Sequence, residues 1–434
     1  MDGPIDVLGQ QSALKGLYTQ LCLCFPVADA SSHTAIISTL RNGLERLSEN
    51  FPWVAGNVTD ARIEALEKTP RLIVKDLRDD PSVPTMDVLR RANFPFSMLD
   101  ENIIAPRKTL PDGSASDSPV FLLQVNFITS GLLLTFNGEH QAMDMIGQGQ
   151  IISLLSKACH NEGFTSEELS SANLPRRNLV PLLDDCYKPG PEIDHQIVKP
   201  RSNHPDNNPP PCTWAYFTFD PTSLATLKAI ATKNLHSDYI SSDDAISAFI
   251  WQSVTRARLP RLNPTDKSIF ARAVDVRRYL DIPPTYPGIV QNMTYHTYTL
   301  QKLIEEPVGS VASQLRLAVD PKTSKLGYNT RALATALSRA SDKSTVSVTA
   351  TLDLSSDIMF SSWAKVNSYH LDFNLGLGKP EAVRRPLFNP VESLIYLMPK
   401  RLDGEIAVAI CLRDEDMERL RADEEFAKYA NYIG

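Results

Sequence analysis

The arrangement of apolar and polar positions predicts alternating strands and helices in the first half of the chain. Residues 18–27 alternate apolar and polar side chains as a strand does, and residues 33–50 repeat apolar side chains at the spacing of an amphipathic helix. Two strands joined by a turn follow within residues 120–137, and a second helix spans residues 145–159. The segment 138–144 therefore lies where a buried strand ends and a helix begins.

The second half shows the same mixture of elements. Strands are predicted at residues 213–219, 268–276, 289–299, 393–399 and 406–412. Helices are predicted at residues 221–234, after the N-cap offered by Ser241 to Asp244, and at the charged carboxy-terminal end. This mixture predicts an α/β or α+β fold with two similar-sized mixed-sheet domains.

A proline-rich stretch at residues 174–211 separates the two halves. It contains nine of the 31 prolines of the chain. Because proline neither continues a helix nor donates a hydrogen bond within a sheet, this stretch is expected to be an extended crossover. We therefore predict an amino-terminal domain at residues 1–173, a linker at 174–211 and a carboxy-terminal domain at 212–434.

Composition limits the classes of function. The 434 residues are 42% apolar and 22% charged, as in ordinary globular proteins, which excludes a disordered or fibrous chain. The net charge of −7 provides no global basic field, so neither nucleic acid nor a membrane is an expected partner. No coiled-coil or exposed apolar repeat suggests assembly, so a monomer is expected.

The cysteines and the first residues favour a cytoplasmic protein. The six cysteines are scattered and lack the spacing of zinc sites, so no metal is expected. Residues 1–11 lack the basic start and apolar run of a signal peptide. We expect reduced thiols and a cytoplasmic location.

His140 and Asp144, between the predicted strand and helix, are the strongest candidates for chemistry. An imidazole titrates near neutrality, so it can accept a proton from an alcohol that is being acylated. A His followed four residues later by Asp is also expected by chance in a chain of this composition. Spacing alone therefore leaves a structural role open.

Further segments accompany this pair. One is Ser361-Ser362-Trp363, followed nine residues later by Asp372-Phe373-Asn374-Leu375-Gly376, and another is the run 273–280, which leads to Gln291-Asn292. With these segments, the whole chain resembles the BAHD-type acyl-CoA-dependent acyltransferases, in particular a fungal branch that contains trichothecene 3-O-acetyltransferases.

The two hallmark motifs of that family are present in altered form. The HxxxDG motif corresponds to residues 140–145, with Met145 in place of the glycine. The DFGWG motif corresponds to residues 372–376, with Asn374 and Leu375 in place of Gly and Trp. These departures move the chain away from the plant enzymes, and Asn374 matches neither the plant nor the fungal branch.

The resemblance implies a fold and a function. It implies two domains like those of chloramphenicol acetyltransferase, with the motif histidine in a channel between them. It further implies an acetyl-CoA-dependent O-acetyltransferase that acts on a hydroxyl of a fungal sesquiterpenoid, such as a trichothecene, in a ternary complex. No cofactor is then bound permanently: acetyl-CoA is a co-substrate, and a small-molecule alcohol is the acceptor.

The resemblance also implies roles for single residues. His140 is the general base, and Asp144 turns away from the cleft to pair with Arg277. The indole N–H of Trp363 points at the developing oxyanion. Asp372 is structural, because the second motif of the family lies away from the reacting atoms.

The expected contacts with acyl-CoA are Ser241 and Ser242, which begin a helix, together with Asn292, Ser361 and Ser362. Ser361 and Ser362 match a family segment along the pantetheine path. The two aspartates that follow Ser242 would repel a phosphate, so N-capping is the alternative role for the serines at the helix start. Outside this set, Lys379, Arg384 and Arg385 are expected to form a solvated basic face.

Several alternatives remain open. The acceptor alcohol or the acyl chain could differ, with a longer acyl-CoA as donor. Amide-forming condensation domains share the HxxxD signature, although their usual second histidine is missing here. A non-catalytic terpenoid-binding protein of the same fold is a further alternative. A serine hydrolase would need a GxSxG turn, which the sequence lacks.

Overall fold

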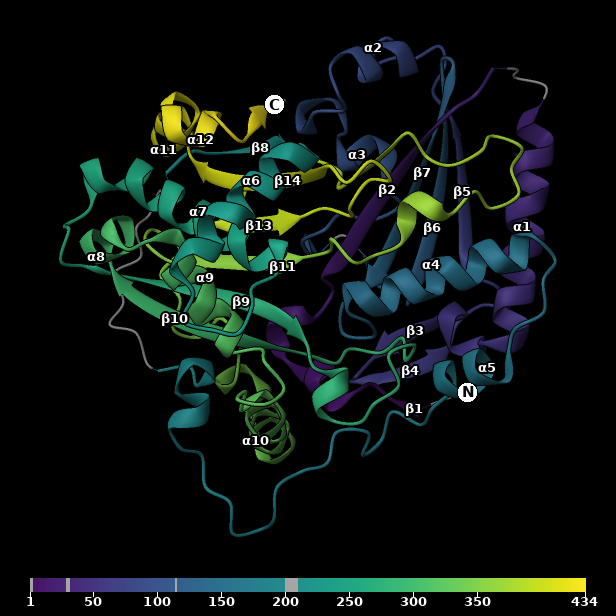
Figure 1. The fold of residues 1–434 in the computed structure, drawn as a ribbon. Coiled ribbons are helices and arrows are strands. Elements are labelled where there is room, and N and C mark those ends of the chain that lie inside the picture. Colours follow the sequence, from purple (N-terminus) through teal and green to yellow (C-terminus); the bar gives the residue numbers. More distant parts are fainter. Residues whose placement is uncertain (1–2, 29–31, 114, 200–209) are drawn as a thin grey trace.

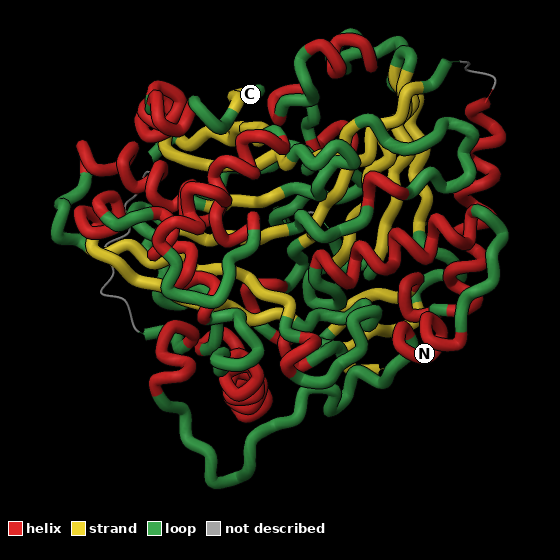
Figure 2. The backbone as a smooth tube through the Cα atoms, in the orientation of Figure 1, coloured by secondary structure: helices red, strands yellow, loops and turns green. Residues whose placement is uncertain are grey.

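The computed structural model describes residues 3–28, 32–113, 115–199 and 210–434. The chain forms two lobes that lie side by side, each with helices packed on a mixed β-sheet (Figure 1). Helices and strands are interspersed through both lobes (Figure 2), which confirms the expected mixed α/β fold. Residues 200–209 of the predicted crossover lie outside the described residues.

A five-stranded sheet with the order β12-β2-β7-β6-β5 forms the centre of the first lobe. Its strands are β2 (Tyr18–Pro26), β5 (Arg71–Asp76), β6 (Phe121–Ile128), β7 (Gly131–Glu139) and β12 (Ala382–Arg384). Only β5 and β6 run parallel, and every other pair is antiparallel. The helices α1 (His33–Asn50) and α4 (Met145–Cys159) pack together over this sheet (Figure 1).

Both faces of this sheet are covered, so its central strands are buried along their length. On β2, Leu21 and Leu23 join the core that includes α1 and α4. The alternate residues Cys22 and Cys24 join a second core with α2 (Met86–Arg91) and α3 (Glu101–Ile104). All nine residues of β7 are buried. The segment that carries His140 is therefore anchored at the end of a rigid strand.

A seven-stranded sheet with the order β10-β9-β11-β13-β14-β8-β15 forms the second lobe. Its strands are β8 (Cys212–Phe219), β9 (Lys267–Asp275), β10 (Gln291–Thr299), β11 (Ile358–Ser362), β13 (Leu394–Leu397), β14 (Ile406–Arg413) and β15 (Asn431–Tyr432). The long helix α7 (Ser242–Arg258) packs against α6 (Pro221–Ala231) and α9 (Val308–Leu317). Ser241 caps α7 in a reciprocal capping box with Asp244.

The chain returns to the first lobe late in its course. After β11, it crosses over α4, and β12 then pairs antiparallel with β2, with Ala382 opposite Cys24 (Figure 1). The first-lobe sheet thus contains a strand from the far end of the sequence. The boundaries at residues 173 and 211 stay predictions.

Smaller elements complete the fold. A three-stranded sheet contains β1 (Gly3–Pro4), β3 (Gly56–Thr59) and β4 (Arg62–Ala65). The remaining helices are α5 (Ser166–Ala172), α8 (Leu300–Glu305), α10 (Leu326–Arg339), α11 (Asp414–Ala422) and α12 (Glu424–Ala427). In the part of the chain that the structure describes, no helix has both the length and the apolar character that a membrane span requires.

Candidate active site

The loop between β7 and α4 is held by hydrogen bonds from several directions. The backbone N–H of His140 donates to the Leu17 carbonyl at 2.8 Å. The buried Glu139 carboxyl accepts from the backbone N–H groups of Gln141 at 2.8 Å and Ala142 at 3.1 Å. Burial raises the pKa of Glu139 to about 8, although the hydrogen bonds from these N–H groups act in the opposite direction. The loop therefore has a fixed backbone on which the imidazole is mounted.

The His140 ring is half-buried, and its Nδ1 lies 3.0 Å from the Met143 carbonyl oxygen. Because a carbonyl only accepts, this contact assigns the proton to Nδ1 and leaves the Nε2 lone pair free. Burial lowers the pKa of His140, and the positive charge of Arg385 lowers it further, while the Met143 carbonyl and Asp144 act in the opposite direction. The ring is therefore a neutral base near pH 7.

Asp144 is fully engaged in structural contacts. It caps α4, since its Oδ1 accepts from the Gly147 N–H at 2.7 Å. Its Oδ2 accepts from the Val290 N–H at 2.8 Å and lies 3.0 Å from Nη2 of Arg277. The structure thus brings together the two residues that the sequence paired, across the boundary between the lobes.

Arg277 ties the second lobe to this loop. Its side chain is 1% exposed and also donates to the carbonyls of Tyr286 at 2.9 Å and Gly288 at 2.7 Å. Burial alone would lower the pKa of Arg277, but the carboxylates of Asp144 and Asp275 raise it above its ordinary value. The guanidinium is therefore a permanent cation that holds the two lobes in register.

The contact between the lobes also requires a glycine. A Cβ atom on Gly147, in the first turn of α4, would lie 2.1 Å from the Pro287 carbonyl oxygen. No side chain fits at that separation, so glycine allows α4 to begin directly against the second lobe.

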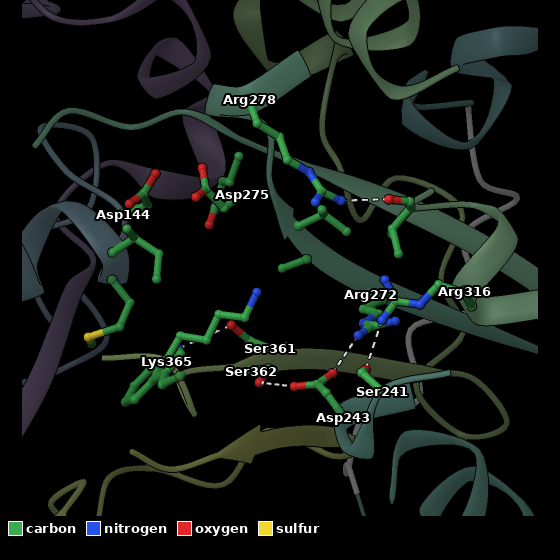
Figure 3. Close-up of a pocket in the computed structure, with 17 residues that line it drawn as sticks. Asp144, Ser241, Asp243, Arg272, Asp275, Arg278, Arg316, Ser361, Ser362 and Lys365 are labelled. Carbon is green, nitrogen blue, oxygen red and sulfur yellow. Dashed lines mark hydrogen bonds and ion pairs between the residues drawn. The ribbon is translucent and has the colours of Figure 1, made fainter. Parts of the chain in front are cut away.

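A cavity of about 270 Å³ opens beside the start of α4 (Figure 3). Its wall includes Asp144 and Met145 from the first lobe and residues of β9, β11 and the α7 N-terminus from the second. The ring of His140 is not part of this wall. The cavity therefore reaches the loop that carries His140 from the side of Asp144.

The charges around this cavity leave a positive surplus. Arg272 pairs with Asp243 and Asp244, and Arg316 pairs with Asp244. In contrast, Arg278 and Lys365 form no ion pair with any described residue, and Arg278 donates to the Val319 carbonyl at 2.6 Å. The Lys365 side chain extends into the open space of the cavity (Figure 3). An anionic ligand is therefore favoured there.

Three of the five predicted acyl-CoA contacts line this cavity, and two do not. Ser241, Ser361 and Ser362 line the cavity. Ser242 is not part of its wall, and Asn292 lies in a different cavity, where its amide contacts Gln196 at 2.6 Å and Thr330 at 3.1 Å. The first three residues are thus grouped with the loop of His140, and the other two are not.

Trp363 also lines the cavity, and it is 3% exposed. Its indole N–H donates to the Ser361 hydroxyl at 3.1 Å. The donor predicted to meet an oxyanion is therefore occupied by a neighbouring hydroxyl in this structure.

Asp372 lies apart from the cavity, on the surface beside the end of α4. Its Oδ1 contacts Nε2 of His160 at 2.5 Å, and it accepts from the Asn374 N–H at 3.1 Å. The neighbouring Phe373 ring is fully buried and lies 5.6 Å from Phe136. The second motif thus fastens the returning chain to the first lobe.

The expectation of a solvated basic face at Arg384 and Arg385 is wrong. Arg384 is 0% exposed and Arg385 is 2% exposed, because β12 carries them into the space between the lobes. The sequence offered no signal for this burial, since Tyr216, Trp363 and Tyr396, which lie against these side chains, come from distant parts of the chain. Sequence reasoning also missed Lys365 and Arg272; a cation within an otherwise apolar strand was the available signal for Arg272.

The sequence is similar to known families and proteins over most of its length. The family model of the Transferase family matches residues 94–427, and that of the trichothecene 3-O-acetyltransferase-like N-terminal domain matches residues 17–159. The O-acetyltransferase dmxR13 of Cryptosporiopsis sp. is 58% identical, over 100% of this chain and 98% of the relative. Trichothecene 3-O-acetyltransferase TRI101 of Fusarium sporotrichioides is 53% identical, over 100% and 97%.

Solved structures share the fold over its full length. TRI101 of Fusarium graminearum, complexed with coenzyme A and deoxynivalenol, matches with a TM-score of 0.96 and 49% sequence identity, over 100% of both chains. The two-lobed fold around the His140 loop is thus shared with a protein whose structure has been solved with coenzyme A and deoxynivalenol bound.

Proposed function

The chain belongs to the Transferase family and is an acyl-CoA-dependent O-acyltransferase, and from that premise we propose that it acetylates a hydroxyl of a trichothecene-like sesquiterpenoid. Acetyl-CoA is the proposed donor, because relatives at 58% and 53% identity are named O-acetyltransferases. The trichothecene class is taken from TRI101 and from its complex with deoxynivalenol.

The orientation of the His140 ring is the main observation that supports this proposal. The contact from Nδ1 to the Met143 carbonyl leaves Nε2 as an acceptor on a half-buried ring, next to a cavity with surplus positive charge. A neutral imidazole with a free Nε2 is the form that a general base requires.

The reaction follows from that form of the ring. Nε2 of His140 removes the hydroxyl proton as the acceptor oxygen attacks the thioester carbonyl carbon. The tetrahedral intermediate then loses the thiolate, the C–S bond breaks, and the imidazolium returns its proton to the sulfur. The products are an acetate ester and free coenzyme A. General base assistance of this kind is worth roughly 10²–10⁴ in rate.

The other predicted residues act around this step. Asp144 and Arg277 hold the loop in place, since their groups are fully used in the contact between the lobes. Trp363 is the proposed oxyanion donor, and its N–H must then exchange the Ser361 hydroxyl for the oxyanion of the intermediate. Asp372 keeps the returning chain on the first lobe.

The cavity at the start of α4 is the proposed acyl-CoA side. Ser241, Ser361 and Ser362 offer hydroxyl groups, and Lys365 and Arg278 offer positive charge to the phosphates. This set does not include Ser242, which is not among the lining residues of the cavity, or Asn292, which lines a different cavity.

We further propose a cytoplasmic monomer that binds no nucleic acid. The scattered cysteines, the net charge of −7 and the absence of assembly repeats in the sequence support this part of the proposal. Light scattering of the purified protein tests the monomer.

A thiol-release assay with mass detection tests the proposed function. The purified chain is offered acetyl-CoA, propionyl-CoA or hexanoyl-CoA with a panel of trichothecene and other terpenoid alcohols. We expect equal amounts of free thiol and acetyl ester, with acetyl-CoA and a trichothecene alcohol as the best pair. Faster thiol release with a longer acyl-CoA or with another alcohol would change the proposed donor or acceptor. Binding of an alcohol without thiol release would instead identify a non-catalytic binding protein.

A further inference from the structure

Arg385 is a buried cation enclosed by aromatic rings. It follows β12 directly and is 2% exposed. Its guanidinium carbon lies 4.3 Å from the ring centre of Phe388, 4.9 Å from that of Tyr396 and 5.4 Å from that of Trp363. Ring faces offset part of the cost of burying a charge, but they are weaker partners than a carboxylate.

The guanidinium is only partly hydrogen-bonded. Its Nη2 donates to the Thr109 hydroxyl at 3.2 Å, whereas Nε and Nη1 are buried without a partner. Among the described residues, no acidic side chain forms an ion pair with Arg385; the Glu101 carboxylate, which accepts from the Thr109 N–H at 2.7 Å, interacts with the Arg385 charge only from a longer distance. Such an incompletely paired charge is expensive to bury, so a purely structural role does not account for it.

The neighbouring Arg384 is as deeply buried as Arg385, but its guanidinium is fully hydrogen-bonded, as expected of a structural arginine. It is 0% exposed, yet its guanidinium donates to three backbone carbonyls, those of Phe94 at 3.1 Å, Asn93 at 3.2 Å and Val383 at 3.1 Å. Every nitrogen of the Arg384 guanidinium therefore has a partner. The two adjacent residues differ in pairing, although they share charge and burial.

Arg385 is connected to the reaction centre on two sides. Trp363, which packs against its guanidinium, lines the cavity together with Asp144. The Thr109 hydroxyl accepts from Nη2 of Arg385, and the Thr109 carbonyl accepts from the N–H of Tyr18. The carbonyl of Leu17, the residue before Tyr18, accepts from the N–H of His140. Burial of the ring lowers the pKa of His140, and the Arg385 charge acts in the same direction at the loop that carries the base.

Other charges surround the same ring. On its own loop, Asp144 favours the charged imidazole, and the buried Glu139 has a pKa raised to about 8. Arg176 donates to the Ala142 carbonyl at 2.7 Å but pairs with Asp6, and Arg277 pairs with Asp144. Arg385 is thus the cation near His140 whose charge is not balanced by a carboxylate within ion-pair distance among the described residues.

We propose that Arg385 is an electrostatic positioning residue for acetyl transfer, whose fixed, incompletely paired charge adds to burial in keeping His140 neutral and favours the oxyanion beside Trp363. This role rests on the proposed function. The charge supplies both effects at once, because a nearby cation disfavours the imidazolium and stabilises negative charge that develops on the carbonyl oxygen.

The pH dependence of kcat/KM for thiol release tests this role. Activity rises with pH as His140 loses its proton, so loss of the Arg385 charge moves this rise to higher pH. For Arg385→Met we expect an upward shift of about 0.5–1 pH unit, as for a unit charge in a medium of intermediate dielectric, and a roughly tenfold lower plateau. Arg385→Lys keeps the charge and should keep the position of the rise.

Arg384→Met is the matched control, since it removes an equally buried cation from the adjacent position. It should lower the melting temperature and leave the pH of the rise unchanged. Arg385→Gln provides a second neutral variant that still reaches Thr109. The proposal is overturned if the neutral Arg385 variants keep the wild-type rise, if Arg385→Lys shifts as they do, or if neither neutral variant folds while Arg385→Lys does.

An NMR titration of the His140 ring, in wild type and Arg385→Gln without substrates, separates this proposal from the proposed function. A higher ring pKa in the variant supports the electrostatic role even if no alcohol is acetylated. An unchanged ring pKa contradicts the role even if the enzyme acetylates a trichothecene.

Discussion

The two hallmark motifs of the family occupy very different surroundings in this molecule. The loop from His140 to Asp144 lies between the lobes, where charged groups are buried and paired across the boundary. The segment from Asp372 to Gly376 lies at the surface and is anchored by an apolar ring, Phe373. Two motifs of one family can therefore differ in burial and in charge pairing, and we propose that the buried, charged one marks the reaction centre and the other the scaffold.

Matched Asp→Asn substitutions in the two motifs provide the sharpest test of this contrast. For Asp144→Asn we expect a loss of about 3–5 kcal/mol in the free energy of unfolding, because the buried Arg277 keeps only the exposed Asp275 as a carboxylate partner. Asn still caps α4, so the loss reports the ion pair. Denaturant unfolding measures it, and a loss below about 1 kcal/mol would show that the buried pair does not hold the lobes together.

Lys365→Ala tests the charge surplus of the cavity. Its ammonium group forms no ion pair with a described residue and extends into the cavity, so its removal should weaken the binding of acyl-CoA (Figure 3). We expect the KM for acetyl-CoA to rise about fivefold with little change in kcat, as for one lost charge-assisted contact of about 1 kcal/mol. Lys379→Ala, a basic residue outside this cavity, is the control. Equal KM values for both variants would contradict the assignment of the acyl-CoA side.

Asp372→Asn should have the smallest effect. The contact of Asp372 with His160 is solvent-exposed, and exposed ion pairs contribute less than about 1 kcal/mol. We expect a slightly lower melting temperature and a kcat within about twofold of wild type. A loss of activity comparable to that of Asp144→Asn, at unchanged stability, would place the second motif in the reaction centre and remove the contrast.

The long elements of the fold were predictable because their periodicity is strong. The strand at residues 18–27, the helix at 33–50 and the helix at 145–159 are present as β2, α1 and α4. The short strands β11 and β12 were missed, since three to five residues carry too little pattern to distinguish a strand from a loop.

The candidate site was partly predictable for a different reason. His140, Asp144 and Arg277 belong to recognisable motifs, and the structure brings them to one place. Arg385 was assigned to the surface because its burial depends on Phe388, Tyr396 and Trp363, which only the folded chain assembles around it. Pairing of a buried charge is a tertiary property, and local sequence does not carry it.

The most direct test of the account compares His140→Ala with His160→Ala, the exposed histidine beside Asp372. Thiol release from acetyl-CoA with a trichothecene alcohol is measured for both variants, and calorimetry measures their binding of coenzyme A. We expect a kcat about 10²–10⁴ lower for His140→Ala, with coenzyme A bound as tightly as by wild type, and an unchanged kcat for His160→Ala. A kcat for His140→Ala within a few-fold of wild type would show that another group accepts the hydroxyl proton.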